Sequence, residues 1–305
     1  MPSKKHLQII VFLFLAHCQD PLPLTESLRK KSEIPPPSTH IFVNGHADDW
    51  MLFMGEYAYE AISSPDNQVV IIILTAGDAG RDETFWRGRE TGSLASVRAV
   101  LDYPIHQGDP SEKDEMMELS GKKLRWHETG NVHTYFLRLP DGYPNGQGSK
   151  THGGQSLYKM EEGKLPSITT VDENDTYTLS DVENVLQDIF TKEHHKDSIY
   201  VHLLDPVGPP DFSHSDHYMA QKLATQALAK MDFQNCKILS FEDYRIQNKT
   251  PNLSGSPYAQ KTTIFAAYDF AMFKAVGECK LCSSGYLAWL ARSYHKEFSC
   301  HGSVL

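Results

Sequence analysis

Short apolar runs alternate with longer amphipathic stretches along most of this chain. The runs are rich in β-branched residues, which is typical of strands buried on both faces of a sheet. They predict strands at residues 41–43, 69–74, 132–139, 198–204, 237–241 and 262–267. The stretches between them predict helices at residues 51–63, 88–101, 180–193 and 216–231. Ser180-Asp-Val-Glu183 has the form of a capping box at the start of the third helix.

This alternation of strands and helices predicts an α/β fold: a Rossmann-like, doubly wound and mostly parallel sheet. Ligands bind at the carboxyl edge of such sheets. Two polar, turn-rich segments at residues 105–130 and 140–178 are therefore expected to be long loops over that edge. A chain of 305 residues allows one large domain or two modest ones. The unbroken alternation favours a single domain over residues 39–305.

The first 18 residues have the order of a secretory signal. Lys4 and Lys5 precede an apolar run at residues 7–16, which is too short to span a bilayer. Leu15-Ala-His-Cys18 resembles a bacterial lipoprotein signal, in which the cysteine is lipidated. Residues 19–38 are rich in proline and read as an extended linker. We therefore expect an exported protein that is periplasmic, lipid-anchored or extracellular, with membrane contact through a lipid on Cys18.

Charge and cysteine content narrow the classes of partner and compartment. The chain has 39 acidic and 29 basic residues and a net charge of −10, which argues against nonspecific nucleic-acid binding. Apart from Cys18, the cysteines form an even set, as an oxidising compartment favours: Cys236, Cys279, Cys282 and Cys300. Their pairing is open. The alternative is a zinc knuckle, in which Cys279-Lys-Leu-Cys282 acts with Cys300-His301.

Two polar clusters follow predicted strands directly. His46, Asp48 and Asp49 come after the first strand, and His214 and His217 come after the fourth. Two histidines and a carboxylate with a vacant position describe a catalytic rather than a structural zinc site. The alternative interpretation of the first cluster is an Asx turn that caps the following helix. Because both clusters lie at carboxyl ends of strands, the metal site is the better explanation.

The motifs resemble those of the PIG-L / LmbE-like family of zinc-dependent N-deacetylases. Its first motif is His-Pro-Asp-Asp-Glu, and this chain has His46-Ala-Asp48-Asp49-Trp50. Its second motif is His-Pro-Asp-His, and this chain has His214-Ser-Asp-His217. The segments between them also match in family order, from about residue 39 to about residue 230: Thr75-Ala-Gly77-Asp-Ala-Gly80-Arg81, Arg87-Gly-Arg-Glu90 and Pro140-Asp141-Gly142.

The resemblance implies a role for each matching residue. A water bound to zinc, or to another divalent transition metal, would attack the amide of an N-acetylated sugar or glycoconjugate. The implied roles are: zinc ligands His46, Asp49 and His217; general base Asp48; a polar group beside the reacting carbonyl, His214; sugar contacts Arg81 and Asp141; and an orienting carboxylate, Asp216. His214, if protonated, would stabilise the oxyanion. Asp216 would orient a histidine or place a charge at the helix N-terminus.

The resulting hypothesis is an exported zinc hydrolase that removes the acetyl group from an N-acetylglucosamine-type sugar. One alternative keeps the metal and changes the substrate to a non-sugar N-acyl compound or an ester. Another is a carbohydrate-binding protein that has kept the fold and lost turnover. Retention of Asp48 beside all three predicted ligands argues against the second alternative.

Overall fold

An eight-stranded sheet forms the centre of the protein. The computed structural model describes residues 36–101, 112–282 and 284–300, so the predicted signal, Cys18 and most of the linker lie outside the described residues. The residues from Pro37 onward group into one compact unit. No helix within the described ranges is long and apolar enough to cross a membrane.

The sheet has the order β10-β9-β8-β1-β2-β5-β4-β3. The five middle strands β9, β8, β1, β2 and β5 are parallel, whereas β10 pairs antiparallel with β9, and β4 pairs antiparallel with β5 and β3. A separate two-stranded sheet pairs β6 with β7. The strands are β1 Ser38–Asn44, β2 Gln68–Thr75, β3 Glu112–Leu119, β4 Lys122–Thr129, β5 Val132–Leu139, β6 Ile168–Thr169, β7 Thr176–Tyr177, β8 Ser198–Asp205, β9 Cys236–Glu242 and β10 His295–Ser299.

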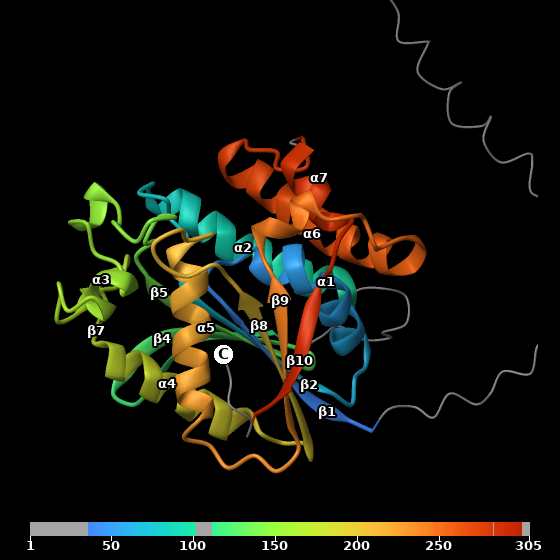
Figure 1. Cartoon of the computed structure of the whole chain (residues 1–305), viewed down its shortest axis with the longest axis horizontal. Helices are drawn as coiled ribbons and strands as arrows, with labels where there is room; N and C mark the ends of the chain where they lie inside the picture. Colours follow the sequence, from blue (N-terminus) through green and yellow to red (C-terminus); the bar gives the residue numbers. More distant parts are fainter. Residues whose placement is uncertain (1–35, 102–111, 283, 301–305) are drawn as a thin grey trace, which may run out of the picture. The chain divides into compact units, whose positions relative to one another are not determined.

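Helices cover both faces of the sheet, and the predicted doubly wound α/β fold is confirmed. In Figure 1, α4 and α5 lie against one face, and α1, α2 and α6 lie against the other. The helices are α1 Asp49–Ser63, α2 Glu83–Leu101, α3 Leu157–Glu161, α4 Leu179–Glu193, α5 Ser215–Leu228, α6 Gly255–Val276 and α7 Ser284–Leu290, with short 3₁₀ turns η1 Lys150–His152 and η2 Tyr244–Asn248.

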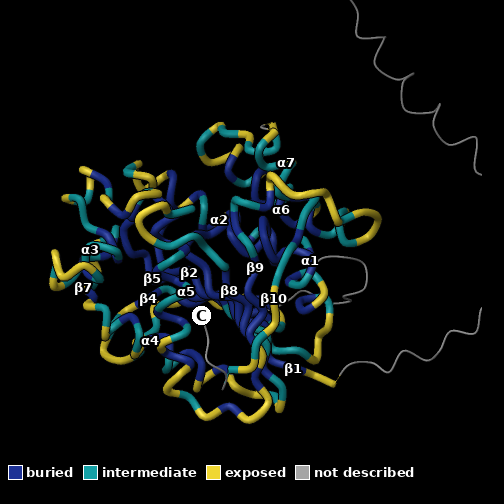
Figure 2. The backbone as a smooth tube through the Cα atoms, in the orientation of Figure 1, coloured by how far each residue is buried: buried dark blue, intermediate teal, exposed yellow. Residues whose placement is uncertain are grey.

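Helices on both faces of the sheet explain why the strands are continuous apolar runs. Along β1, Ile41 and Val43 point into the core beneath α4 and α5, while Phe42 points into the core beneath α1, α2 and α6. Successive strand residues face opposite sides, so a strand covered on both faces needs apolar residues throughout. Figure 2 shows the resulting buried centre of the sheet.

Three local predictions were wrong. Residues 262–267, predicted as a strand, lie within α6, where Ile264, Tyr268 and Met272 recur at helical spacing and are buried. Part of the predicted loop 105–130 is the hairpin β3–β4, whose two-residue turn Ser120-Gly121 has positive φ at both positions. The capping box of α4 lies two residues earlier than predicted and joins Thr178 to Asp181.

Two disulfides settle the cysteine pairing within the described residues. Cys236 on β9 bonds to Cys300 at the end of β10, and Cys279 bonds to Cys282 after α6. The zinc-knuckle alternative is therefore wrong, because all three of its cysteines are bonded to other cysteines. Its remaining member, His301, lies outside the described residues.

The two disulfides are predicted to contribute unequally to stability. Cys236 and Cys300 are 64 residues apart, and Cys279 and Cys282 are 3 apart. Loop-closure entropy then predicts losses of about 4 kcal/mol for Cys236→Ser/Cys300→Ser and about 2 kcal/mol for Cys279→Ser/Cys282→Ser. Equilibrium urea unfolding of both double variants measures the difference. Equal losses would contradict the loop-closure explanation.

Candidate metal centre and active site

The turn between β1 and α1 is held closely against α5. A side chain at Gly45 would place its Cβ 3.1 Å from the backbone of Asp216 and 3.2 Å from the ring of His217, so the close approach of the two segments favours glycine here. Thr75, at the end of β2, donates from Oγ1 to the Gly45 carbonyl at 2.9 Å. The turn that carries His46 is therefore positioned by two neighbouring elements.

Three donor atoms of His46, Asp49 and His217 converge in this turn. The separations are 3.5 Å between His46 Nδ1 and Asp49 Oδ1, 3.2 Å between His217 Nε2 and Asp49 Oδ1, and 3.3 Å between the two histidine nitrogens. Bonds of about 2.0–2.1 Å in a tetrahedral site place ligand atoms about 3.3 Å apart. The two nitrogens and one oxygen therefore fit a divalent transition-metal ion, and all three residues are buried.

A second carboxylate faces the remaining nitrogen of each histidine. His46 Nε2 lies 3.2 Å from Asp216 Oδ2, and His217 Nδ1 lies 3.2 Å from Asp243 Oδ2. In the neutral form, each imidazole keeps its proton on the nitrogen that faces the carboxylate, so the other ring nitrogen has the lone pair that would bind a metal ion. Both lone pairs then point towards Asp49 Oδ1. This is the usual arrangement around metal-binding histidines.

The electrostatics of the cluster favour positive charge. Burial opposes protonation of His46 and His217, but the neighbouring carboxylates outweigh it, raising the pKa of His46 well above its ordinary value and that of His217 to about 9. Burial also opposes ionisation of Asp49, yet the two histidines hold its pKa well below the usual range. The site is therefore suited to a bound cation.

Asp48 lies beside the cluster and pairs with an arginine from α2. Arg89 donates from Nη2 to Asp48 Oδ1, and both side chains are nearly buried. Burial opposes the charged guanidinium, but Asp48 is the first of the groups that raise the pKa of Arg89. This ion pair fixes the orientation of the Asp48 carboxylate. A carboxylate in this position can accept a proton.

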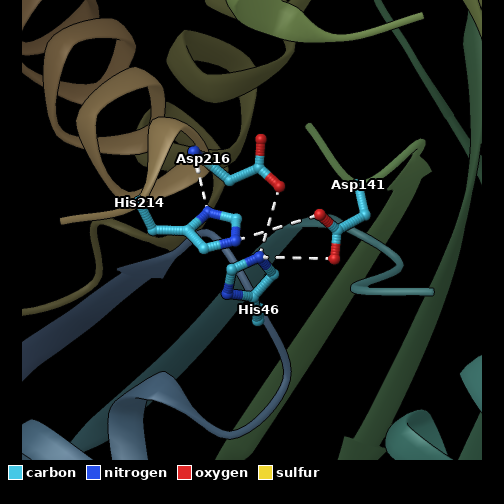
Figure 3. A group of neighbouring side chains, drawn as sticks. All are labelled: His46, Asp141, His214 and Asp216. Carbon is cyan, nitrogen blue, oxygen red and sulfur yellow. Dashed lines mark hydrogen bonds and ion pairs between the residues drawn. The ribbon is translucent and has the colours of Figure 1, made fainter. Parts of the chain in front are cut away.

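Asp141, His214 and Asp216 surround the outer nitrogen of His46 (Figure 3). Asp141 Oδ2 lies 3.9 Å from His46 Nε2, and Asp141 Oδ1 lies 3.9 Å from His214 Nε2. His214 Nδ1 accepts the backbone N–H of Asp216 at 3.2 Å. Burial and the nearby His46 and His217 lower the pKa of His214, so its imidazole is neutral and carries its proton on Nε2.

Arg81 makes its contacts away from this group. Its guanidinium pairs with Glu278, at the end of α6, and lies 3.8 Å from the ring centre of Phe85. The side chain is 41% exposed, in contrast to the buried Asp141. The structure therefore brings seven of the eight sequence-predicted residues together, and Arg81 lies with Glu278 instead.

Sequence reasoning missed three residues that support the site: Arg89, Asp243 and Asp78. Arg89 follows Phe85 and precedes Gly92 on the buried face of α2, so helical spacing could have selected it. Asp243 directly follows β9, at a carboxyl end of the sheet. Asp78 follows β2 and accepts backbone N–H groups from Gly80 and Asp141 at 2.7 and 2.9 Å.

Aromatic residues from the C-terminal part enclose His217. The rings of His217 and Tyr244 are 5.0 Å apart, and Trp289 lies 5.0 Å beyond Tyr244. Trp289 also donates from Nε1 to the Tyr244 carbonyl at 3.2 Å. Phe53 of α1 completes this side, 6.2 Å from His217. These aromatic rings keep water away from the imidazole of His217, which strengthens its electrostatic interactions with the neighbouring groups.

The family model described as PIG-L, GlcNAc-PI de-N-acetylase, matches residues 41–228. The chain belongs to the PIG-L family. The family resemblance inferred from the sequence motifs is confirmed. The chain is a metal-dependent N-deacetylase, which is a hydrolase. The match spans all the predicted ligands, and Asp243, Tyr244 and Trp289 lie beyond its end. No curated protein matches the sequence.

Solved structures similar to this PIG-L chain include three at low sequence identity. An N,N′-diacetylchitobiose deacetylase from Pyrococcus horikoshii is 16% identical, with 78% of this chain and 72% of that chain covered and a TM-score of 0.43. The zinc-inhibited form of teicoplanin deacetylase Orf2 is 12% identical, with coverages of 77% and 84% and a TM-score of 0.43. The hydratase GalB from Pseudomonas putida is 10% identical, with coverages of 83% and 82% and a TM-score of 0.43.

Removal of Asp243 is predicted to weaken metal binding without unfolding the protein. Asp243→Ala leaves His217 Nδ1 without its carboxylate, and loss of such a partner typically costs 10–100-fold in metal affinity. Asp243→Asn, which keeps a carbonyl oxygen, should recover part of the loss. Calorimetric titration with zinc measures both, with Asp232→Ala at an exposed position as control. Unchanged affinity in Asp243→Ala would show that His217 needs no such partner.

Proposed function

We propose that this protein is an exported zinc-dependent deacetylase that removes the N-acetyl group from an N-acetylglucosamine-type sugar or glycoconjugate. The observation that carries the proposal is the triangle of donor atoms from His46, Asp49 and His217, with Asp48 beside it. The family description, a de-N-acetylase of a GlcNAc compound, supports the substrate class.

Zinc suits this donor set better than a hard cation does. Two imidazoles and one carboxylate are ligands that zinc accepts, whereas magnesium and calcium prefer sites built wholly from oxygen. A zinc ion held there would polarise the amide carbonyl and lower the pKa of a nearby water molecule. The remaining chemistry falls to side chains of the chain itself.

Asp48 is the group that moves the proton. Its carboxylate is oriented by Arg89 and in this proposal accepts a proton from the attacking water. The water oxygen bonds to the acyl carbon, the C–N bond breaks, and the same proton passes from Asp48 to the departing amine. The products are acetate and the free amino sugar.

His214 acts in this proposal as a neutral hydrogen-bond donor. Its Nδ1 already accepts the Asp216 N–H, which leaves the Nε2 proton free for a developing oxyanion. The lowered pKa of His214, caused first by its burial, favours this neutral form over the protonated form that the sequence analysis allowed. A donor fixed by the first turn of α5 needs no rearrangement as charge develops.

Asp141 and Arg81 are assigned to the sugar. Asp141 is fixed by the backbone N–H of Tyr143 at 2.7 Å and can accept a hydroxyl proton with its remaining lone pairs. Arg81 is exposed enough to reach a sugar after leaving Glu278. The pair between Arg81 and Glu278 is largely in water, where such pairs contribute little stability.

Export is supported by the cysteines as well as by the N-terminal pattern. Disulfides persist in oxidising compartments and are rare in the cytosol. The described residues contain two, Cys236–Cys300 and Cys279–Cys282. A periplasmic, extracellular or lipid-anchored protein fits both observations, with Cys18 as the site of the anchor.

Acetate release tests the function directly. The full chain is incubated with N-acetylglucosamine compounds from monomer to oligomer, with and without a zinc chelator. We expect release that the chelator abolishes and added zinc restores, because the ligand triangle holds the ion on which the reaction depends. If metal-loaded protein releases acetate from none of these sugars, the substrate is a different acyl compound or the protein is a binder.

Asp48→Asn is predicted to separate chemistry from metal binding. An amide cannot accept the proton, so kcat should fall about 10²–10⁴-fold. Metal content should stay near that of the wild type, because Asp48 supplies no atom to the ligand triangle. Acetate assays and elemental analysis of the same sample measure both, with the exposed Asp66→Asn as control. Full activity in Asp48→Asn would rule out Asp48 as the base.

A further inference from the structure

The ring of Tyr143 lies beside the carboxylate of Asp141. The N–H of Tyr143 donates to Asp141 Oδ1 at 2.7 Å, and the N–H of Ala79 donates to Asp141 Oδ2 at 3.3 Å. The hydroxyl of Tyr143 in turn donates to the Ala79 carbonyl at 3.2 Å. The carboxylate and the phenol ring therefore both bridge from Tyr143 to Ala79, side by side, where the loops after β2 and β5 meet.

The backbone at this junction has an unusual conformation for the side chains it carries. Tyr143 has a φ of 62° and Ala79 a φ of 48°, so both lie in the left-handed region. Bulky residues rarely adopt this conformation, whereas Asn and Gly adopt it readily, and such exceptions gather at functional sites. A junction that only joined two loops could use Asn or Gly at position 143. The presence of an aromatic ring there needs a further explanation.

The ring of Tyr143 is not used to anchor the loop in a core. In the part of the chain that the structure describes, Tyr143 is half-buried yet packs against neither hydrophobic core, and no aromatic or cationic side chain stacks on its ring. Tyr158 of α3 differs, because its ring packs edge-on against Phe212 at 4.6 Å and Tyr218 at 6.4 Å. Tyr158 is therefore a loop anchor, whereas the ring of Tyr143 remains open to a ligand.

A pyranose sugar combines the two properties that this ring and carboxylate can recognise. Its C–H groups form an apolar face that packs on an aromatic ring, and its hydroxyls donate to a carboxylate. Asp141 Oδ2 lies 3.9 Å from His46 Nε2, and Figure 3 shows the carboxylate pointing towards that histidine. A sugar bound to Asp141 would thus have its ring near Tyr143 and its acyl group near the candidate metal ligands.

We propose that Tyr143 binds the substrate by packing its ring on the apolar face of the pyranose. This stacking contact would make the enzyme prefer N-acetylated sugars in ring form to acyclic N-acetyl amides. The inference rests on the proposed deacetylase function and names a residue that sets its substrate class. Because the ring contacts the sugar and not the reacting amide, it stabilises ground state and transition state alike, which affects KM more than kcat.

Steady-state acetate release from two substrates tests the stacking contact on the zinc-loaded full chain. The substrates are N-acetylglucosamine and N-acetylethanolamine, an acyclic acetamide with one hydroxyl. Tyr143→Asn removes the ring and suits the left-handed backbone. We expect it to raise KM for the sugar about tenfold with little change in kcat, and to leave kcat/KM for N-acetylethanolamine near the wild-type value. Tyr143→Phe, which keeps the ring, should restore the wild-type KM for the sugar.

Tyr294→Asn is the matched control. Tyr294 is also half-buried, and its hydroxyl also donates to a loop carbonyl, that of Thr250 at 2.7 Å. It directly precedes β10, which four strands separate from β5, so the KM for the sugar should not change. The proposal fails if Tyr143→Asn leaves the sugar KM unchanged or lowers kcat/KM equally for both substrates, or if Tyr143→Phe acts like Tyr143→Asn. The ring would then serve only the structure of the loop.

Equilibrium binding separates this inference from the proposed function. N-acetylglucosamine is titrated calorimetrically into zinc-loaded Asp48→Asn and into the same variant with Tyr143→Asn added. We expect the Kd to be about tenfold higher in the double variant. If the wild type releases no acetate but Asp48→Asn binds the sugar, the deacetylase proposal fails, while the two Kd values still decide the role of Tyr143. Equal Kd values, or no binding to Asp48→Asn, would overturn the stacking contact.

Discussion

The metal cluster depends on where two imidazole protons lie. Asp216 faces Nε2 of His46, Asp243 faces Nδ1 of His217, and the opposite nitrogen of each ring points to Asp49. Both orienting carboxylates are fully buried, where a hydrogen bond to an ionised group is strong and an unpaired one is costly. If either ring turned or changed tautomer, the three donor atoms would no longer converge, so the chemistry assigned to Asp48 and His214 depends on these two contacts.

The parallel sheet makes this convergence possible by ending five strands at one edge. The turn that carries His46 and Asp49 follows β1, and His217 comes after β8, which is the neighbour of β1 in the sheet. Asp78 after β2 fixes the backbone of Asp141 after β5, and those strands are also neighbours. Two of these loop contacts use a carboxylate that accepts a backbone N–H: Asp78 accepts from Asp141, and Asp216 accepts from Gly142. Buried loops need such partners, because unpaired backbone groups away from water are costly.

The sequence predicted the ligand triangle because its information is local. His46 and Asp49 follow closely after β1, and His217 lies in the first turn of the helix that comes after β8. Arg89 lies inside the matched segment Arg87-Gly-Arg-Glu90 but was given no role, because its contact with Asp48 crosses from α2 to the turn after β1 and cannot be read from the segment itself. The false strand at residues 262–267 came from counting β-branched residues, whereas burial of Ile264, Tyr268 and Met272 follows a helical period. The exposed β3 lacks the alternating apolar pattern, so only its turn chemistry could have revealed the hairpin.

The part of the chain after the family match completes the site. Asp243 directly follows β9, the next strand after β8 in the sheet. Like His46 and His217, it lies beyond the carboxyl end of a parallel strand. Tyr244 and Trp289 cover the ring of His217, and Glu278 pairs with Arg81. The candidate ligands and the proposed base, Asp48, come from the region shared with the family, whereas the carboxylate that orients His217 and the aromatic rings around it come from this C-terminal segment. Differences in metal affinity and substrate choice among proteins with the same motifs are therefore expected to arise in the segment that the motifs do not cover.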